Sequence, residues 1–181
     1  MDELVLDAQK RMDKSIDSLK YSFAHLRSAR ANPAILDGIK CDYYGEKMDI
    51  VNLCGISVPE PRQILVKPYS REDLKPIAQA IAAANIGINP QVEADAIRLI
   101  VPALTQEIRQ QVAKQAKQLA EEAKVSLRNI RRDVMDLVKI DDTMSDDYKD
   151  RLKKDLEKVM DDQVKKVETL LEEKTKEIMT I

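Results

Sequence analysis

The residues with the clearest capacity for chemistry are arginines in one short segment, VSLRNIRRDV at Val125–Val134. It holds Arg128, Arg131 and Arg132 within five positions, in a chain where 30 Lys and Arg stand against 32 Asp and Glu. A planar guanidinium group offers several N–H donors, and it suits the paired oxygens of phosphate groups. The segment indicates a surface that binds an anion, although on an arbitrary helix bundle a solvated face is the more common explanation.

Neighbouring basic residues extend this positive charge along a helix. With Arg128 placed at zero and ~100° added per residue, the apolar positions occupy roughly 160° to 280°. The basic residues that fall at roughly 300° to 40° are Lys114, Lys117, Lys124, Arg128, Arg131 and Arg132. Arg109 lies at the border near ~260°, and Glu121 lies inside the basic sector and weakens it. Because aromatic residues make up only 3% of the chain, base stacking is disfavoured, and the pattern favours binding to the phosphates of folded RNA.

Catalytic and metal-binding patterns are missing from the sequence. His25 is the single histidine, and Cys41 and Cys54 match no metal-ligand spacing, so we interpret both cysteines as buried thiols. The four glycines form no phosphate-binding loop, and the segment DDTMSDD lacks the central Gly and terminal Glu of a calcium loop. We therefore expect a protein that is not an enzyme and that holds no cofactor and no metal.

The N-terminal sequence and the hydropathy bear on localisation. The segment MDELVLDAQKRMDK is acidic and lacks the apolar region of a signal peptide, and no apolar run approaches ~18 residues. These features predict a soluble cytoplasmic protein with no membrane partner, and we expect it to be a monomer.

Three amphipathic helices are expected to position the basic residues. The first runs from Leu4 to Arg30, the second starts at Thr105 and continues for about nine turns, and Ser145 caps the third. Each has one apolar face, so none would be stable alone. We predict a discontinuous three-helix bundle formed by residues 1–30 and 105–181.

The section between the first and second helices, residues 31–104, differs from them in composition and in the spacing of its apolar residues. It contains all seven prolines and all four glycines, and alternating residues such as those of Ile39–Tyr43 predict short strands. Ser70 and Asp73 resemble a capping box that starts a helix. We predict a small inserted domain, joined to the bundle by a hinge. The hinge residues are Arg30, Ala31 and Asn32 on one crossing, and Pro102, Ala103, Leu104 and Thr105 on the other.

Several long segments of this chain resemble the ribosome recycling factor family. They are LRSARANPAILDGIKCDYYG, ISVPEPR, NIGINP, AIRLIVPALTQEIR and KQAKQLAEEAKVSLRNIRRD, which follow one another in the family's order and cover essentially the whole chain. The resemblance implies an α+β fold that is L-shaped and similar in size to tRNA. Its long arm would be the three-helix bundle, and its short arm a three-layer β/α/β domain.

The resemblance also implies a function. Family members bind the RNA of the large ribosomal subunit after termination, and with elongation factor G and GTP they split the post-termination complex. Matched by motif, the RNA-binding residues are Arg109 in TQEIR and Arg128 and Arg131 in LRNIRRD, with Arg132 next. Two alternatives remain open at this point, which are an adaptor that binds protein helices and an RNA chaperone without a ribosomal site.

This chain departs from the family pattern near the predicted hinge. Ser28-Ala29 stands where Thr-Gly is usual, and Pro102-Ala103 where Pro-Pro is usual. The segment QVEADA lacks the usual Gly, and the connection between the last two helices is about one helical turn shorter than in many relatives. We expect the departures at the hinge to affect its stiffness, and the shorter connection to shorten the far end of the bundle, away from the hinge, without affecting the arginines.

Overall fold

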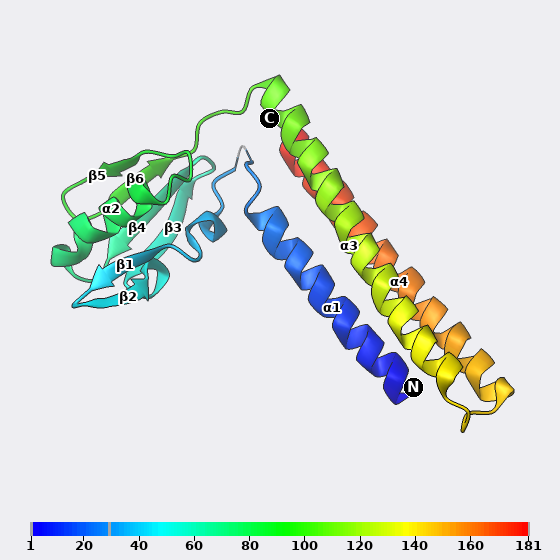
Figure 1. The fold of residues 1–181 in the computed structure, drawn as a ribbon. Helices are drawn as coiled ribbons and strands as arrows, with labels where there is room; N and C mark the ends of the chain where they lie inside the picture. The colour runs from blue at the N-terminus through cyan, green and yellow to red at the C-terminus, as the bar shows by residue number, and fades with distance from the viewer. Residues whose placement is uncertain (1, 29, 181) are drawn as a thin grey trace. The chain divides into compact units, whose positions relative to one another are not determined.

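The computed structural model describes residues 2–28 and 30–180, which divide into two compact units (Figure 1). The helical unit comprises the chain up to Leu26 together with Gln110–Thr180, and the insert unit comprises Arg27–Arg109. The helical unit is therefore built from both ends of the chain. The predicted α+β class, with a helix bundle and an inserted domain that contains strands, is confirmed.

Three long helices make up the helical unit, namely α1 (Glu3–Ala24), α3 (Gln106–Ile140) and α4 (Asp146–Met179). In α1 and α3 their buried apolar residues recur every three or four positions, as the burial of one helix face requires, whereas in α4 the buried polar residues Gln163 and Lys174 stand in the same series. The buried apolar residues are Val5, Ala8, Met12, Ile16, Leu19 and Phe23 of α1, Val112, Ala116, Ala120, Ala123, Leu127, Ile130, Val134 and Val138 of α3, and Leu152, Leu156, Val159, Val167 and Ile178 of α4. The Ser145 side chain caps α4 by accepting the Tyr148 N–H at 3.4 Å, as predicted.

Helix α1 is shorter than predicted, and one apolar residue of α3 lies outside its core. Helix α1 ends at Ala24 rather than near Arg30. Beyond it, the buried Ser28 hydroxyl donates to the Arg30 carbonyl at 2.8 Å, which favours a turn over further helix. In α3, Leu137 is 52% exposed and Val138, at 2%, takes the core position, because successive steps of four residues carry the buried face past Leu137.

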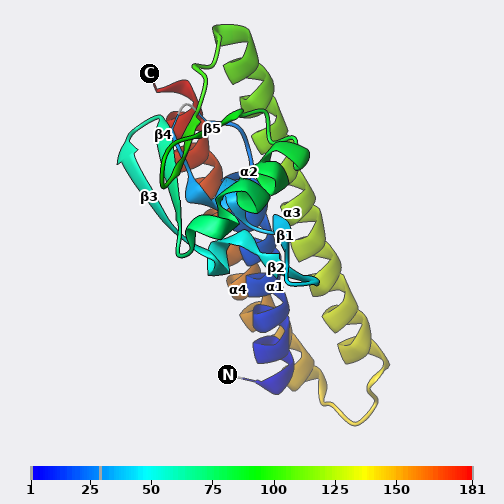
Figure 2. The same ribbon diagram turned by 90° about the vertical axis from the view of Figure 1, so that its left-hand side faces the viewer.

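The insert unit contains two antiparallel sheets and one α-helix. Strands β1 (Lys40–Tyr43) and β2 (Glu46–Asp49) form a hairpin. A four-stranded sheet has the order β3-β4-β6-β5, with β3 at Cys54–Glu60, β4 at Gln63–Pro68, β5 at Pro90–Val92 and β6 at Ile97–Ile100. Helix α2 (Leu74–Ala83) contacts both β1 and β5, and Figure 2 shows the hairpin apart from β3 and β4.

The core of the insert unit combines side chains from both sheets and from α2. Fully buried members include Ile64 and Leu99 from the sheet and Ile77 and Ile81 from α2. Cys41 and Cys54 are buried free thiols, as expected. The Cys54 thiol donates to the Ile50 carbonyl at 2.8 Å, and burial raises the pKa of this thiol to about 11.

The capping box expected at α2 is not formed. Ser70 instead precedes a 3₁₀ turn at Arg71–Asp73, and within the described chain its side chain makes no cap hydrogen bond. Helix α2 starts only at Leu74, so Asp73 occupies its N-cap position.

Both chain crossings into the insert unit are tied to its loops and strands. The Ala31 N–H donates to the Pro61 carbonyl at 2.7 Å. Asn32 Oδ1 accepts the Ala34 N–H at 3.0 Å, which starts the 3₁₀ turn at Pro33–Leu36. On the second crossing, the Val101 N–H donates to the Arg62 carbonyl at 2.8 Å. Ala31 and Asn32 thus bond within the insert unit, and their place in a hinge stays a prediction.

Candidate RNA-binding face

Helix α3 carries the six predicted basic residues on one side, and we call them the basic face. Its members are Lys114, Lys117, Lys124, Arg128, Arg131 and Arg132. Neither Gly nor Pro interrupts α3 over its 35 residues, and the Thr105 hydroxyl accepts the Ile108 N–H at 3.3 Å at its start. An unbroken helix of this length holds all six residues in a fixed register.

The edge of the basic face that borders α4 is partly neutralised. Arg131 Nη2 lies 3.4 Å from Glu157 Oε1, and Lys124 Nζ lies 3.2 Å from Glu168 Oε1. Lys124 Nζ is also 3.6 Å from Glu121 Oε1 on its own helix. The Lys124 side chain is only 17% exposed, against 42% for Arg131. These two cations are therefore the less accessible members of the face.

The outward part of the basic face has no such partners. Within residues 2–28 and 30–180, the side chains of Lys114, Lys117 and Arg128 are exposed, and none has a carboxylate oxygen within 4.0 Å of its cationic nitrogen. Arg132 is also exposed, and its Nη2 donates to the neutral Asn129 side chain at 3.2 Å. These residues keep unshared N–H donors for an incoming anion. Arg128 is the best placed, because it is exposed and its guanidinium group has no carboxylate partner among the described residues, whereas Arg132 already donates to Asn129.

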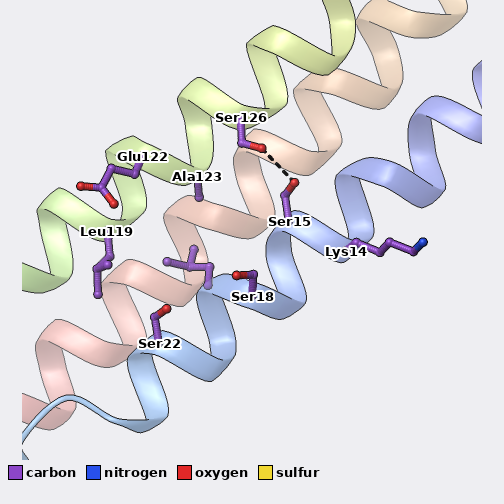
Figure 3. A pocket seen from close by; sticks show the side chains of 9 residues that line it. Lys14, Ser15, Ser18, Ser22, Leu119, Glu122, Ala123 and Ser126 are labelled. Atoms are coloured by element: carbon purple, nitrogen blue, oxygen red, sulfur yellow. Dashed lines mark hydrogen bonds between the residues drawn. The ribbon is translucent and has the colours of Figure 1, made fainter.

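Polar contacts with α1 fix the other side of α3. Arg11 Nη2 lies 2.9 Å from Asp133 Oδ2, and the Ser15 and Ser126 hydroxyl oxygens are 3.0 Å apart (Figure 3). Beside this pair runs a groove of about 350 Å³, whose lining includes Ser18, Ser22, Lys14 and Glu122. In Figure 3 the side chains of Lys14 and Glu122 point away from each other at opposite sides of the groove. The contacts with α1 orient α3 so that its basic face is turned away from that seam.

Arg109 differs from the other predicted site residues. It lies in the first turn of α3, and the residue is 8% exposed. It is not one of the exposed cations of the basic face, and its role in RNA binding stays a prediction.

Glu157 and Glu168 were not predicted from the sequence as partners of the basic face. They are eleven residues apart, or about three helical turns, so they lie on one side of α4. That spacing is visible in the sequence. Which side of α4 borders α3 is set by the packing of the bundle, and no local pattern reveals it.

Two further observations limit the chemistry of the described chain. Its residues form no group of three or more His, Cys, Asp or Glu side chains that could hold a metal ion. None of the helices in the described part combines the length and the apolar character needed to cross a bilayer.

Comparisons with known proteins agree with the sequence resemblance. Residues 19–179 match the model of the family described as "Ribosome recycling factor". A ribosome-recycling factor from Staphylococcus carnosus is 42% identical over 184 residues, with 100% of both chains covered. Another, from Ureaplasma parvum serovar 3, is 48% identical over 159 residues, which cover 88% of this chain and 87% of that protein.

Two solved structures extend these similarities to the fold. A solution structure of the ribosome recycling factor matches with a TM-score of 0.82 and 34% identity, over 100% of both chains. The second belongs to models of the T. thermophilus ribosome recycling factor and the E. coli elongation factor G bound to the E. coli post-termination complex. It matches with a TM-score of 0.67 and 34% identity, over 98% of both chains. On the family model, the full-length relatives and the shared fold, this chain belongs to the ribosome recycling factor family.

Proposed function

We propose that this chain binds the large ribosomal subunit after termination and, with elongation factor G and GTP, splits the post-termination complex. The observation that carries the proposal is the outward part of the basic face, where Arg128 and its neighbours keep donors free for phosphate. Membership of the family supports it, as does the related T. thermophilus factor described with elongation factor G on a post-termination complex. The chain acts as a cytoplasmic monomer without a cofactor, and GTP hydrolysis belongs to its partner.

The basic face binds ribosomal RNA through phosphates rather than through bases. Arg128 and Arg132 supply guanidinium donors, and Lys114 and Lys117 extend the positive charge along α3. Each neutralised phosphate releases bound counterions, so binding weakens as salt rises. Aromatic residues make up only 3% of the chain, so few side chains can stack on bases. This agrees with recognition of RNA by its shape.

The bundle serves in this mechanism as a rigid support on which the insert unit turns. At ~1.5 Å per residue, the 35 residues of α3 span roughly 50 Å without a break. Force from the GTPase turns the insert unit about the two chain crossings, which include the predicted hinge residues Pro102–Thr105. The bundle remains fixed on the large subunit while the insert unit moves.

Binding to purified large subunits across a salt series tests the proposal. We expect Arg128→Ala to weaken binding roughly tenfold at low salt and to lower the slope of log affinity against log salt by about one. Arg151→Ala is the matched control, because Arg151 is an exposed arginine of α4 outside the basic face. Equal binding by wild type and Arg128→Ala would show that the basic face does not contact the subunit.

The same preparations separate the two alternative functions. An adaptor for protein helices would show little dependence on salt and little effect of Arg128→Ala. An RNA chaperone would bind an unrelated structured RNA as tightly as it binds the large subunit. Splitting of post-termination ribosomes, followed by light scattering with and without elongation factor G, would give no signal for either alternative.

A further inference from the structure

We infer that Glu157 and Glu168 of α4 compete with RNA phosphates for the cations of the basic face, and that they lower the affinity of this face for the ribosome. The inference rests on the proposed function, since it concerns the regulation of the same surface. It assigns a role to two carboxylates that lie beside the binding cations without being part of the apolar core.

The geometry places one carboxylate of α4 against each cation at the α4 edge. Glu157 Oε1 is 3.4 Å from Arg131 Nη2, and Glu168 Oε1 is 3.2 Å from Lys124 Nζ. Arg131 follows Lys124 along α3, whereas its partner Glu157 precedes Glu168 along α4. This reversed order is expected for antiparallel helices. The two pairs therefore occupy two levels of the same seam.

The two ion pairs contribute little to the stability of the bundle, so phosphate can replace their carboxylates. Both glutamate side chains are about half exposed, and ion pairs with this much water contact contribute little to stability. The Arg131 Nε–H is buried and has no acceptor among the described residues, so Glu157 satisfies the guanidinium group only in part. A phosphate that takes over from Glu157 could offer this guanidinium group more acceptor oxygens than the carboxylate does.

This arrangement divides the basic face into two sets. Lys114, Lys117, Arg128 and Arg132 meet no carboxylate among the described residues within salt-bridge distance, and they can bind phosphates at once. Arg131 reaches phosphate only by giving up Glu157, and Lys124 only by giving up Glu168 and Glu121. The charges of these carboxylates also repel the RNA backbone. The second set thus adds less affinity than its charge alone implies, and it keeps the complex easier to dissociate.

Removal of one negative charge without loss of side-chain bulk tests this inference. Because a partly exposed pair is weak, we expect Glu157→Gln and Glu168→Gln each to bind large subunits about two- to fivefold more tightly at low salt. We expect dissociation to slow by a similar factor. Each freed cation should also steepen the salt dependence of binding, by up to about one unit of slope.

Glu173→Gln is the matched control for general charge effects. Glu173 is an exposed glutamate of α4 that lies about 160° around the helix from Glu157, whereas Glu168 lies only about 20° from it. All three variants change the net charge equally. A local effect requires Glu157→Gln to bind more tightly than Glu173→Gln, and the gain must vanish when Arg131→Ala is added.

The outcomes separate the inference from the proposed function. If Arg128→Ala weakens binding but Glu157→Gln behaves like Glu173→Gln, then Glu157 does not compete with RNA. The proposal that the basic face binds RNA would be unaffected. If the gain of Glu157→Gln persists in the Arg131→Ala background, Glu157 acts through general charge and the inference is likewise overturned. If Arg128→Ala has no effect, the proposed function itself fails.

Discussion

Gln163 provides the sharpest test of the energetics of the helical unit. It lies on α4, is 1% exposed, and its Nε2 donates to Asp13 Oδ1 of α1 at 2.8 Å. Donation to a carboxylate fixes the orientation of the amide, because the carbonyl oxygen could not make that contact. Its Oε1 is then buried without a hydrogen-bond partner among the described residues. One side chain thus makes a favourable contact and leaves an acceptor unsatisfied.

Replacing Gln163 with Met separates these two contributions. A buried acceptor without a partner costs about 1–3 kcal/mol, whereas a typical hydrogen bond contributes about 1 kcal/mol net. The Asp13 side chain is 47% exposed and keeps Lys166 Nζ at 3.5 Å, so water can replace the lost amide donor. Met is unbranched like Gln and carries no group that needs a partner. We therefore expect Gln163→Met to raise the free energy of unfolding by about 1 kcal/mol.

Urea unfolding, followed by the helical circular dichroism signal, measures this change. The dependence of the free energy on urea should match that of wild type, so that midpoints can be compared directly. Gln118→Met is the control, since the Gln118–Glu122 hydrogen bond on α3 is exposed and its loss should change stability by less than about 0.5 kcal/mol. A loss of stability of ~1 kcal/mol or more in Gln163→Met would refute the reasoning. It would show that Oε1 has a partner, such as a water in the adjoining groove beside Gln9.

Three further predictions concern other parts of the chain. Burial holds the pKa of Cys54 at about 11 against an ordinary 9.0, so the unfolded state loses this proton first as pH rises. Stability should fall between those pH values by on the order of 2 kcal/mol, and urea unfolding of Cys54→Ala should show a smaller fall. Gly87 has φ +79°, and a Cβ there would lie 2.8 Å from Arg27 Nη2, whereas Gly55 has no atom closer than 3.9 Å. Thermal unfolding of Gly87→Ala should therefore show a loss of about 1 kcal/mol, and a larger loss in Gly55→Ala would contradict this explanation. Ser145→Ala should lower stability by about 0.5–1 kcal/mol through loss of the α4 cap, and Ser145→Asp should restore it.

Features with a local physical cause could be predicted from the sequence. The apolar spacing of α3 predicts a single long helix, and the same geometry places Arg128 opposite its buried face. Ser145 followed by two aspartates predicts the start of α4. Each of these depends on residues within a few positions of one another, where helix geometry alone decides the outcome.

Features that depend on distant partners could not be predicted in the same way. Beyond α1, the Ala31 N–H donates to the Pro61 carbonyl, and no sequence pattern near Ala24 predicts this contact. Strands β2 and β5 are short and largely exposed, so they lack the alternation that marks a half-buried strand. The pairing of Arg131 with Glu157 likewise required the packing of α3 on α4 to be known.

The pairing of α1 with α4 has a consequence for synthesis of the chain. Asp13 and Gln163, which bond to each other, are 150 residues apart, so α1 has no α4 to pack against until α4 has been synthesised. The insert unit is continuous in sequence and can fold as soon as Arg109 is complete. A chain that stops before α4 would then carry a folded insert unit and an unassembled arm. Only a product that includes α4 could present the basic face on a finished bundle, so a chain that stops before α4 would lack the assembled face.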